Sequence, residues 1–240
     1  MNNTAIVIIA TSLLLASACS DSRHRNGNGH TTTRKRNVGE FSQLRVNGVF
    51  PVTLTQNGSE PSVTIVADEN LQDLVEVKNQ NGVLNISTKK NPSIGKSEKF
   101  KVLINIGKVH QIDFKAVGEL KSEGLLTFDS LEVNSESVGN LNLELNTGFL
   151  RANLKSVGRS QFSGTAKEVR INNKSIGALN TYNLKADVLM IHNTAMGIAE
   201  VYAEKEIYIR SSSVGALHYK GPAQIKELSV EGLGEVKHIE

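Results

Sequence analysis

A short motif recurs seven times between Ala116 and Gly234, and it constrains the fold more than any other feature of the sequence. Each copy is a small residue, then an aliphatic residue or Met, then glycine. The glycines are Gly118, Gly139, Gly158, Gly177, Gly197, Gly215 and Gly234. They are separated by 21, 19, 19, 20, 18 and 19 residues. A period of this length indicates a solenoid, in which one supersecondary unit stacks on the next.

Apolar and polar residues alternate around each glycine, which predicts strands with one buried face. The position six residues before the glycine is apolar in every copy: Ile112, Val133, Ala152, Ile171, Ile191, Ile209 and Leu228. Helical spacing does not recur. The sequence therefore predicts an all-β solenoid with about 19–20 residues per coil. At ~4.8 Å per coil, the six intervals give a ladder about 29 Å long.

The glycines are predicted to be structural turn residues with φ above zero, a conformation that costs a side chain with a Cβ ~1–2 kcal/mol. The small residue before them suits a crowded corner between stacked coils. The aliphatic residue between the two is predicted to point into the core. This set of inward corner residues is Val117, Val138, Val157, Ile176, Met196, Val214 and Leu233.

The N-terminus is typical of an exported protein. Residues 1–18 hold an apolar run, Ala5 to Ala16, which is too short to span a bilayer but suits a secretion signal. The only cysteine, Cys19, follows small residues as in a bacterial lipobox, although Ala16 stands where Leu is usual. We therefore predict a lipoprotein-type signal peptide over residues 1–18 and lipid attachment at Cys19. The alternative is an ordinary secretory signal that is cleaved near Ala18.

The rest of the chain is predicted to form a tether and one domain. Residues 19–37 are polar and basic and are expected to be a flexible tether. Residues 38–237 are expected to form a single β-solenoid domain. Within it, residues 38–110 lack the strict glycine ladder and are predicted to supply an irregular N-terminal β cap and the first coils, and residues 111–237 the regular coils.

The sequence offers no catalytic or metal-binding constellation. Its histidines are isolated from one another, and no pair has metal-ligand spacing. We predict no cofactor, no metal and no enzymatic activity. The formal net charge is only +3 and aromatic residues make up 5%, which does not favour nucleic acid as a partner. A row of Asn134, Asn153 and Asn172 recurs five residues before the glycine, and we expect it to be a structural amide ladder.

The whole pattern resembles the DUF2807 family, labelled as an auto-transporter adhesin head GIN domain. The resemblance covers about Val38 to Lys237. It rests on Phe41-x-x-Leu44-x-Val46-x-Gly48-x-x-x-Val52-x-Leu54, on Val102-x-Ile104-x-Ile106, on Ala116-Val117-Gly118 and on the repeated Ser-Val-Gly turns. The family implies a right-handed β-helix-like fold, a Gram-negative envelope setting, an adhesive role and no established catalytic residues.

Three functions remain open. The preferred one is a non-catalytic, lipid-anchored envelope protein, on the outer membrane, with a binding or adhesion domain. Its partners would be the membrane, through the lipid, and a protein or surface polymer. The second is an envelope scaffold that self-associates as a homo-oligomer, for which the C-terminal strand edge near Val236 is the expected surface. The third is a carbohydrate-active enzyme or acyltransferase on a β-helix, which the irregular spacing and scattered acids disfavour.

Overall fold

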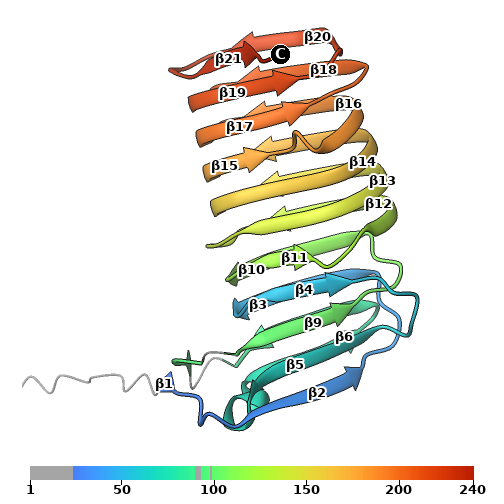
Figure 1. Cartoon of the computed structure of the whole chain (residues 1–240), viewed down its shortest axis with the longest axis vertical. Helices are drawn as coiled ribbons and strands as arrows, with labels where there is room; N and C mark the ends of the chain where they lie inside the picture. Colours follow the sequence, from blue (N-terminus) through green and yellow to red (C-terminus); the bar gives the residue numbers. More distant parts are fainter. Residues whose placement is uncertain (1–23, 90–92, 98) are drawn as a thin grey trace, which may run out of the picture.

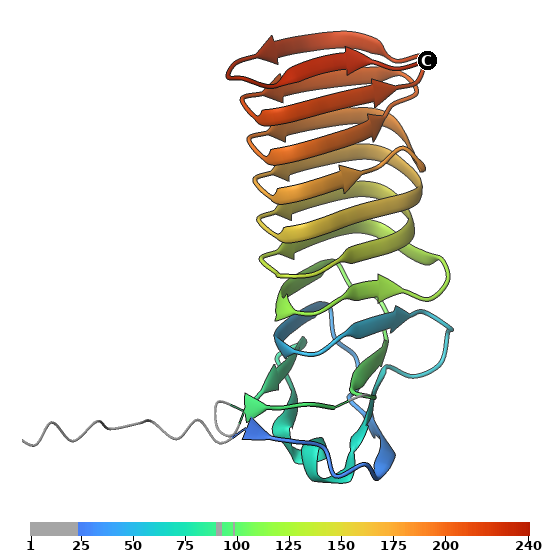
Figure 2. The same ribbon diagram turned by 60° about the vertical axis from the view of Figure 1, so that its left-hand side comes forward.

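The protein is a β-solenoid of about seven turns on a β cap (Figures 1 and 2). This computed structural model describes residues 24–89, 93–97 and 99–240. The predicted all-β solenoid is confirmed. Residues 1–18, for which a signal peptide is predicted, and Cys19 lie outside the described residues.

Each regular coil consists of two strand segments that meet at the glycine corner and at a second, opposite corner. The strands of the coils are β10 (Gln111–Val117), β11 (Leu120–Ser122), β12 (Leu126–Ser135), β13 (Leu141–Leu154), β14 (Val157–Asn173), β15 (Ile176–Asn180), β16 (Leu184–Asn193), β17 (Met196–Tyr202), β18 (Glu206–Ser211), β19 (Val214–Lys220), β20 (Gln224–Val230) and β21 (Glu235–His238). All pair in parallel with the equivalent strand of the next coil. Strand residues of one coil are paired with the residues at the same position of the repeat in the next coil. Equivalent residues therefore form rows along the solenoid.

The core is a stack of aliphatic side chains. The positions six and eight residues before the glycine are buried in the central coils, for example Ile171 and Val169, and so is the position two residues after it, for example Leu179. Val, Ile and Leu suit this setting because branched side chains pack well on a pleated surface. The predicted alternation is thus confirmed for these positions.

The N-terminal part closes the base of the solenoid. Its elements are β1 (His24–Arg25), β2 (Thr31–Asn37), β3 (Gln43–Val49), β4 (Val52–Thr55), β5 (Ser62–Asp68), the 3₁₀ helix η1 (Glu69–Leu74), β6 (Val75–Gln80), β7 (Val83–Thr88), β8 (Ser93–Ile94) and β9 (Lys101–Asn105). β3 and β4 form the first coil, since they pair in parallel with β10 and β11. β2, β5 and β9 are joined antiparallel beneath it.

The flexible tether predicted for residues 19–37 is wrong for its last part. Residues 31–37 form β2, which pairs along its whole length with β5, from Thr31 opposite Asp68 to Asn37 opposite Ser62. η1 packs against both strands. The side chain of Gln72, in η1, is fully buried and donates to the carbonyl oxygens of Thr32 and Ile65 at 2.9 and 3.1 Å. The cap therefore begins inside the basic stretch, whose charged side chains lie on the outermost strand and protect its free edge.

Candidate functional site

The glycine corner is packed tightly enough to exclude a Cβ. Gly158 has a φ of +135°, and a Cβ placed on it would lie 2.2 Å from the carbonyl oxygen of Gly139 in the coil below. Gly177 meets Gly158 in the same way. The prediction of a positive φ is confirmed for the ladder glycines from Gly118 to Gly215. Gly234 does not have a positive φ.

The prediction that the aliphatic corner residues point inward is wrong. Their side chains are 47–54% exposed in six coils, and Leu233 is 90% exposed. The small residue before each of the six aliphatic residues is buried instead, with 1–7% exposure: Ala116, Ser137, Ser156, Ser175, Ala195 and Ser213. Only a small side chain fits inside this corner, so strict alternation turns the next, larger one outward.

Buried serines and asparagines form hydrogen bonds with one another at this corner. The hydroxyl of Ser156 lies 2.8 Å from that of Ser135 and 3.1 Å from that of Ser137. The backbone N–H of Ser156 donates to the hydroxyl of Ser175, and Asn173 donates its amide to Asn193 at 2.9 Å. Hydrogen-bonded polar groups are tolerated in a core, and they tie each coil to the next.

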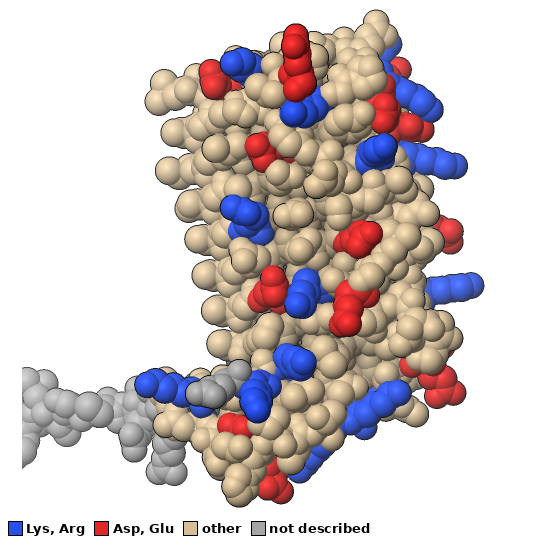
Figure 3. All heavy atoms as spheres, in the orientation of Figure 1, with Lys and Arg blue, Asp and Glu red and all other residues tan. Residues whose placement is uncertain are grey.

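The outward residues form a continuous row that we name the aliphatic ridge. It comprises Val49, Val117, Val138, Val157, Ile176, Met196 and Val214. Neighbours in this row are partners across adjacent strands. Figure 3 shows this edge on the left as regularly spaced uncharged knobs, with the charged side chains set back from it. A patch of this length on an otherwise polar surface is typical of an interaction site.

A row of charges runs beside the ridge. Glu136 pairs with Lys115 at 3.0 Å and with Lys155 at 3.4 Å. Hydrogen bonds from these two lysines, followed by their charge, lower the pKa of the Glu136 carboxyl below its ordinary value. At the base of the ridge, Ile94 and Lys89 line one hollow of about 420 Å³ with Val49, Val117 and Val138.

A second candidate surface, the arginine–amide face, lies on the strands that lead into the glycine corner. Arg151 lies opposite Arg170 on the adjacent strand. In the neighbouring row of outward residues, Arg210 lies opposite His192 on the adjacent strand. Both Arg151 and Arg170 lie over the ring of Phe149, at 5.8 and 5.4 Å from its centroid. The three arginines border an open hollow of about 650 Å³ together with Asn153, Asn172 and Tyr208.

The expected amide ladder is present in part on this face. Asn153 donates to Asn134 at 2.8 Å, and Asn134 donates to Asp113 at 2.9 Å. Partial burial raises the pKa of Asp113, but hydrogen bonds from Gln111, Asn134 and Arg45 and the charge of Arg45 outweigh it and lower the pKa below its ordinary value. The side-chain oxygen of Asn172 is buried without a hydrogen-bond partner, so the ladder does not continue to it. The row lies on strands rather than at a corner.

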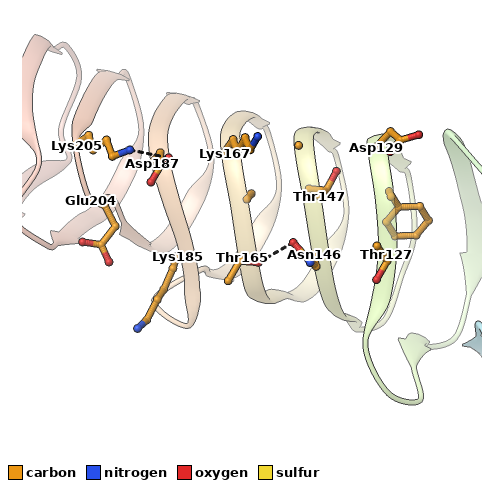
Figure 4. A pocket seen from close by; sticks show the side chains of 13 residues that line it. Thr127, Asp129, Asn146, Thr147, Thr165, Lys167, Lys185, Asp187, Glu204 and Lys205 are labelled. Atoms are coloured by element: carbon orange, nitrogen blue, oxygen red, sulfur yellow. Dashed lines mark hydrogen bonds and ion pairs between the residues drawn. The ribbon is translucent and has the colours of Figure 1, made fainter.

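A shallow groove of about 890 Å³ crosses the opposite corner (Figure 4). Its polar side chains are partly engaged with one another. Thr165 donates to Asn146 at 2.8 Å, and Lys205 pairs with Asp187 at 3.0 Å. The hydroxyls, amides and charges of neighbouring coils thus face one open trough.

The match to a family model decides the classification. The model described as "Putative auto-transporter adhesin, head GIN domain", DUF2807, matches residues 40–223. The chain belongs to the DUF2807 family. Among curated proteins, no significant match is found.

Solved structures resemble this DUF2807 chain over nearly its whole length. A protein from Bacteroides fragilis NCTC 9343, described as a putative adhesin, is 27% identical, with a TM-score of 0.84 over 90% of this chain and 100% of that one. Two proteins from Parabacteroides distasonis ATCC 8503 share the fold. One, described as a putative lipid binding protein, is 18% identical with a TM-score of 0.65, over 91% of this chain and 100% of that one. The other, described as a putative adhesin, is 21% identical with a TM-score of 0.64, over 90% and 100%.

These comparisons support an adhesion-type β domain and a place in the cell envelope or at the cell surface. Within the described part of this DUF2807 domain, no group of three or more His, Cys, Asp or Glu side chains is arranged to hold a metal ion. Nor is any helix in those residues long and apolar enough to cross a membrane.

Proposed function

We propose that the protein is a non-catalytic, lipid-anchored binding protein of a Gram-negative outer membrane, and that its solenoid carries the adhesive surface. The adhesin descriptions of the family and of the Bacteroides fragilis neighbour support the binding role. The groups whose pKa values are shifted also support it. Asp113, Glu136 and Arg210, for example, each have a partner on an outer row of the solenoid, and they do not converge on one cavity.

The arginine–amide face is the observation that carries this proposal. Arg151 and Arg170 lie opposite each other on successive coils, at the ~4.8 Å spacing of strands, and Arg170 also pairs with Glu168 at 2.7 Å. Guanidinium groups bind carboxylates and sulfates through paired hydrogen bonds, and side-chain amides bind hydroxyls. An anionic surface polysaccharide, with repeated acidic groups and hydroxyls, is the ligand class that fits.

The membrane anchor is proposed at Cys19, which lies only five residues before the first described strand, β1. Its support is the sequence alone: an apolar run, small residues before the cysteine and the absence of a second cysteine. Cys19→Ala should move the protein from the detergent phase to the aqueous phase. A wild-type protein that already partitions into the aqueous phase would refute the anchor.

The adhesive role is tested by affinity electrophoresis of the protein in gels that contain heparin or alginate as model acidic polymers. The Arg151→Ala/Arg170→Ala variant should lose most of the retardation shown by the wild type. Arg159→Ala is the matched control, since Arg159 is exposed on the face that follows the glycine corner. Equal retardation of both variants and wild type would exclude the arginine–amide face as the binding surface.

Self-association is a second candidate function, because the last coil leaves core positions open. Ile225, Leu228 and Val230 are 43–51% exposed, whereas earlier coils bury the residues equivalent to Leu228. A second copy that pairs with β20 or β21 would cover them. Leu228→Glu and Val236→Pro should then convert a dimer to a monomer in light scattering. A wild-type protein that is monomeric at high concentration would reject this function.

A further inference from the structure

The aliphatic ridge requires an explanation beyond strand propensity. Seven successive coils place a large apolar side chain at the same half-exposed position. Threonine is also β-branched and suits an exposed strand, yet it occurs at none of the seven positions, whereas the unbranched Met196 occurs at one. What the seven residues share is an apolar side chain.

The first described strand lies at the base of this ridge. β1 pairs with β8, where Arg25 is opposite Ile94, and Ile94 borders the same hollow as Val49 and Val117. Both views place β1 at the lower left, on the side of the glycine corner (Figures 1 and 2). The five residues from Cys19 to the start of β1 can span at most about 18 Å, because an extended chain covers about 3.3–3.6 Å per residue. A lipid on Cys19 would hold the ridge side of the domain at the membrane.

The charges at this end suit an anionic lipid surface. Lys89 lines the hollow at the base of the ridge, where Lys115 also lies but is paired with Glu136 at 3.0 Å. Lys96 contacts the segment after β1, since its carbonyl oxygen accepts the N–H of Gly27. Figure 3 shows Lys and Arg side chains gathered at the foot of this edge. Basic side chains next to an apolar surface are the combination found in segments that bind at the membrane interface.

The size of the ridge argues for a lipid surface over a second copy of the chain. The ridge is one side chain wide. Seven half-exposed aliphatic side chains offer on the order of 400 Å² of apolar area. A stable protein interface needs about 800 Å² from each partner. A lipid surface needs no such area when an anchor already holds the protein there, because the contact is then intramolecular in effect.

We infer that the aliphatic ridge rests on the lipid surface to which the chain is anchored, so that the solenoid lies along the membrane instead of standing on it. The inference rests on the proposed lipid at Cys19. Each ridge residue projects by one side chain only, so the contact lies at the headgroup boundary. The polar groove of Figure 4, at the opposite corner, then faces away from the membrane.

The test uses the full-length lipidated protein in vesicles of phosphatidylethanolamine and phosphatidylglycerol. A lipidated Cys19 has no free thiol, so an introduced cysteine is the only site for a thiol-reactive fluorophore. Val157→Cys places the probe on the ridge, and Lys185→Cys, exposed at the groove, is the matched control. Thermal melting temperatures of both labelled variants that equal that of the wild type establish that the variants keep the fold.

We expect iodide to quench the Val157 probe at least about fivefold less than the Lys185 probe, because the ion stays in water. Lipids with a nitroxide near the headgroup should quench the Val157 probe and spare the Lys185 probe. Protection at position 157 should be lost when Val138 and Ile176 are both changed to Thr, which keeps the β-branched shape and adds a hydroxyl.

Three results would overturn the inference. An intact mass without lipid on Cys19 refutes the proposed anchor and the ridge contact together. A lipidated protein whose two probes are quenched alike by iodide refutes the ridge contact and leaves the proposed function standing. Protection at position 157 that rises with protein density, without quenching by nitroxide lipids, assigns the ridge to a second copy of the chain.

Discussion

Gly158 and Gly139 pack backbone against backbone, with the carbonyl oxygen of Gly139 2.2 Å from the position that a Cβ of Gly158 would occupy. The φ of Gly158, +135°, is also one that side chains rarely adopt. Two separate physical constraints, backbone conformation and the distance between coils, therefore demand glycine at this place in the coils from Gly139 to Gly215.

These two constraints are separable by mutation. Gly158→Ala should destabilise the protein by about 3 kcal/mol or more, because it adds a backbone clash to the conformational strain. Gly124→Ala is the control. Gly124 has a φ of +82°, and no atom lies within 4 Å of the position that its Cβ would occupy, so only the strain of about 1–2 kcal/mol applies. Urea unfolding measures both, and equal losses would show that coil stacking does not require glycine.

The reversed orientation of Ser156 and Val157 gives a second prediction. Val157→Asp should cost no more than about 1 kcal/mol, since the side chain is already half exposed. Ser156→Val should cost about 1–3 kcal/mol, because it overfills a buried corner and removes hydrogen bonds to Ser135 and Ser137. If Val157→Asp is the more damaging of the two in chemical denaturation, the exposure of the ridge is wrong.

The same pair of residues shows which part of the corner is predictable from the sequence. Alternation that starts from the buried Val169 and Ile171 continues inward through Asn173 and Ser175, so parity alone places Ile176 outside. The hydrophobicity of Ile176 alone would suggest the opposite, a side chain that points into the core. Parity prevails because the backbone crosses a corner too narrow for a branched side chain, and the serine hydroxyls there find partners in adjacent coils. The arginine–amide face is visible in the same repeat, as outward rows seven and five residues before the glycine.

The start of the cap is not predictable from composition. Residues 31–37 are polar and basic, and the strand they form depends on pairing with β5, about thirty residues later, and on the buried Gln72. Contacts at that separation leave no periodic signal in the stretch itself. The regular coils are predictable because each repeats the same local pattern.

Asp113 predicts a dependence of stability on pH. Its pKa in the folded protein lies below the ordinary value of 3.8, so the carboxylate form is favoured by folding. This contribution is present above about pH 4 and is lost as the pH falls below 3.8 toward the folded pKa. Because Asp113 is partly exposed, the contribution is at most about 1 kcal/mol.

Asp113→Asn should therefore lower stability at pH 7 and flatten the decline in the free energy of unfolding below about pH 4. Asp129→Asn, at the exposed opposite corner, is the control. Urea midpoints between about pH 2.5 and pH 7 measure both variants. If the urea midpoints of Asp113→Asn and wild type change in parallel over this pH range, Asp113 does not contribute to the pH dependence of stability.

Gln72 predicts how the base of the solenoid is held closed. Gln72→Leu keeps the size of the side chain but removes the amide donors that now reach Thr32 and Ile65, inside the cap. A buried carbonyl that loses a partner costs about 1–3 kcal/mol, and the loss should fall on the cap first. Amide hydrogen exchange should accelerate in β2 and β5 while β13 and β14 stay protected.

Asp73→Ala breaks the exposed Arg34–Asp73 pair and is the control, with an expected cost of no more than about 0.5 kcal/mol. Uniformly faster exchange over the whole solenoid in Gln72→Leu would mean that the cap and the coils unfold as one unit. The cap strand β2 would then not be held in place independently of the coils.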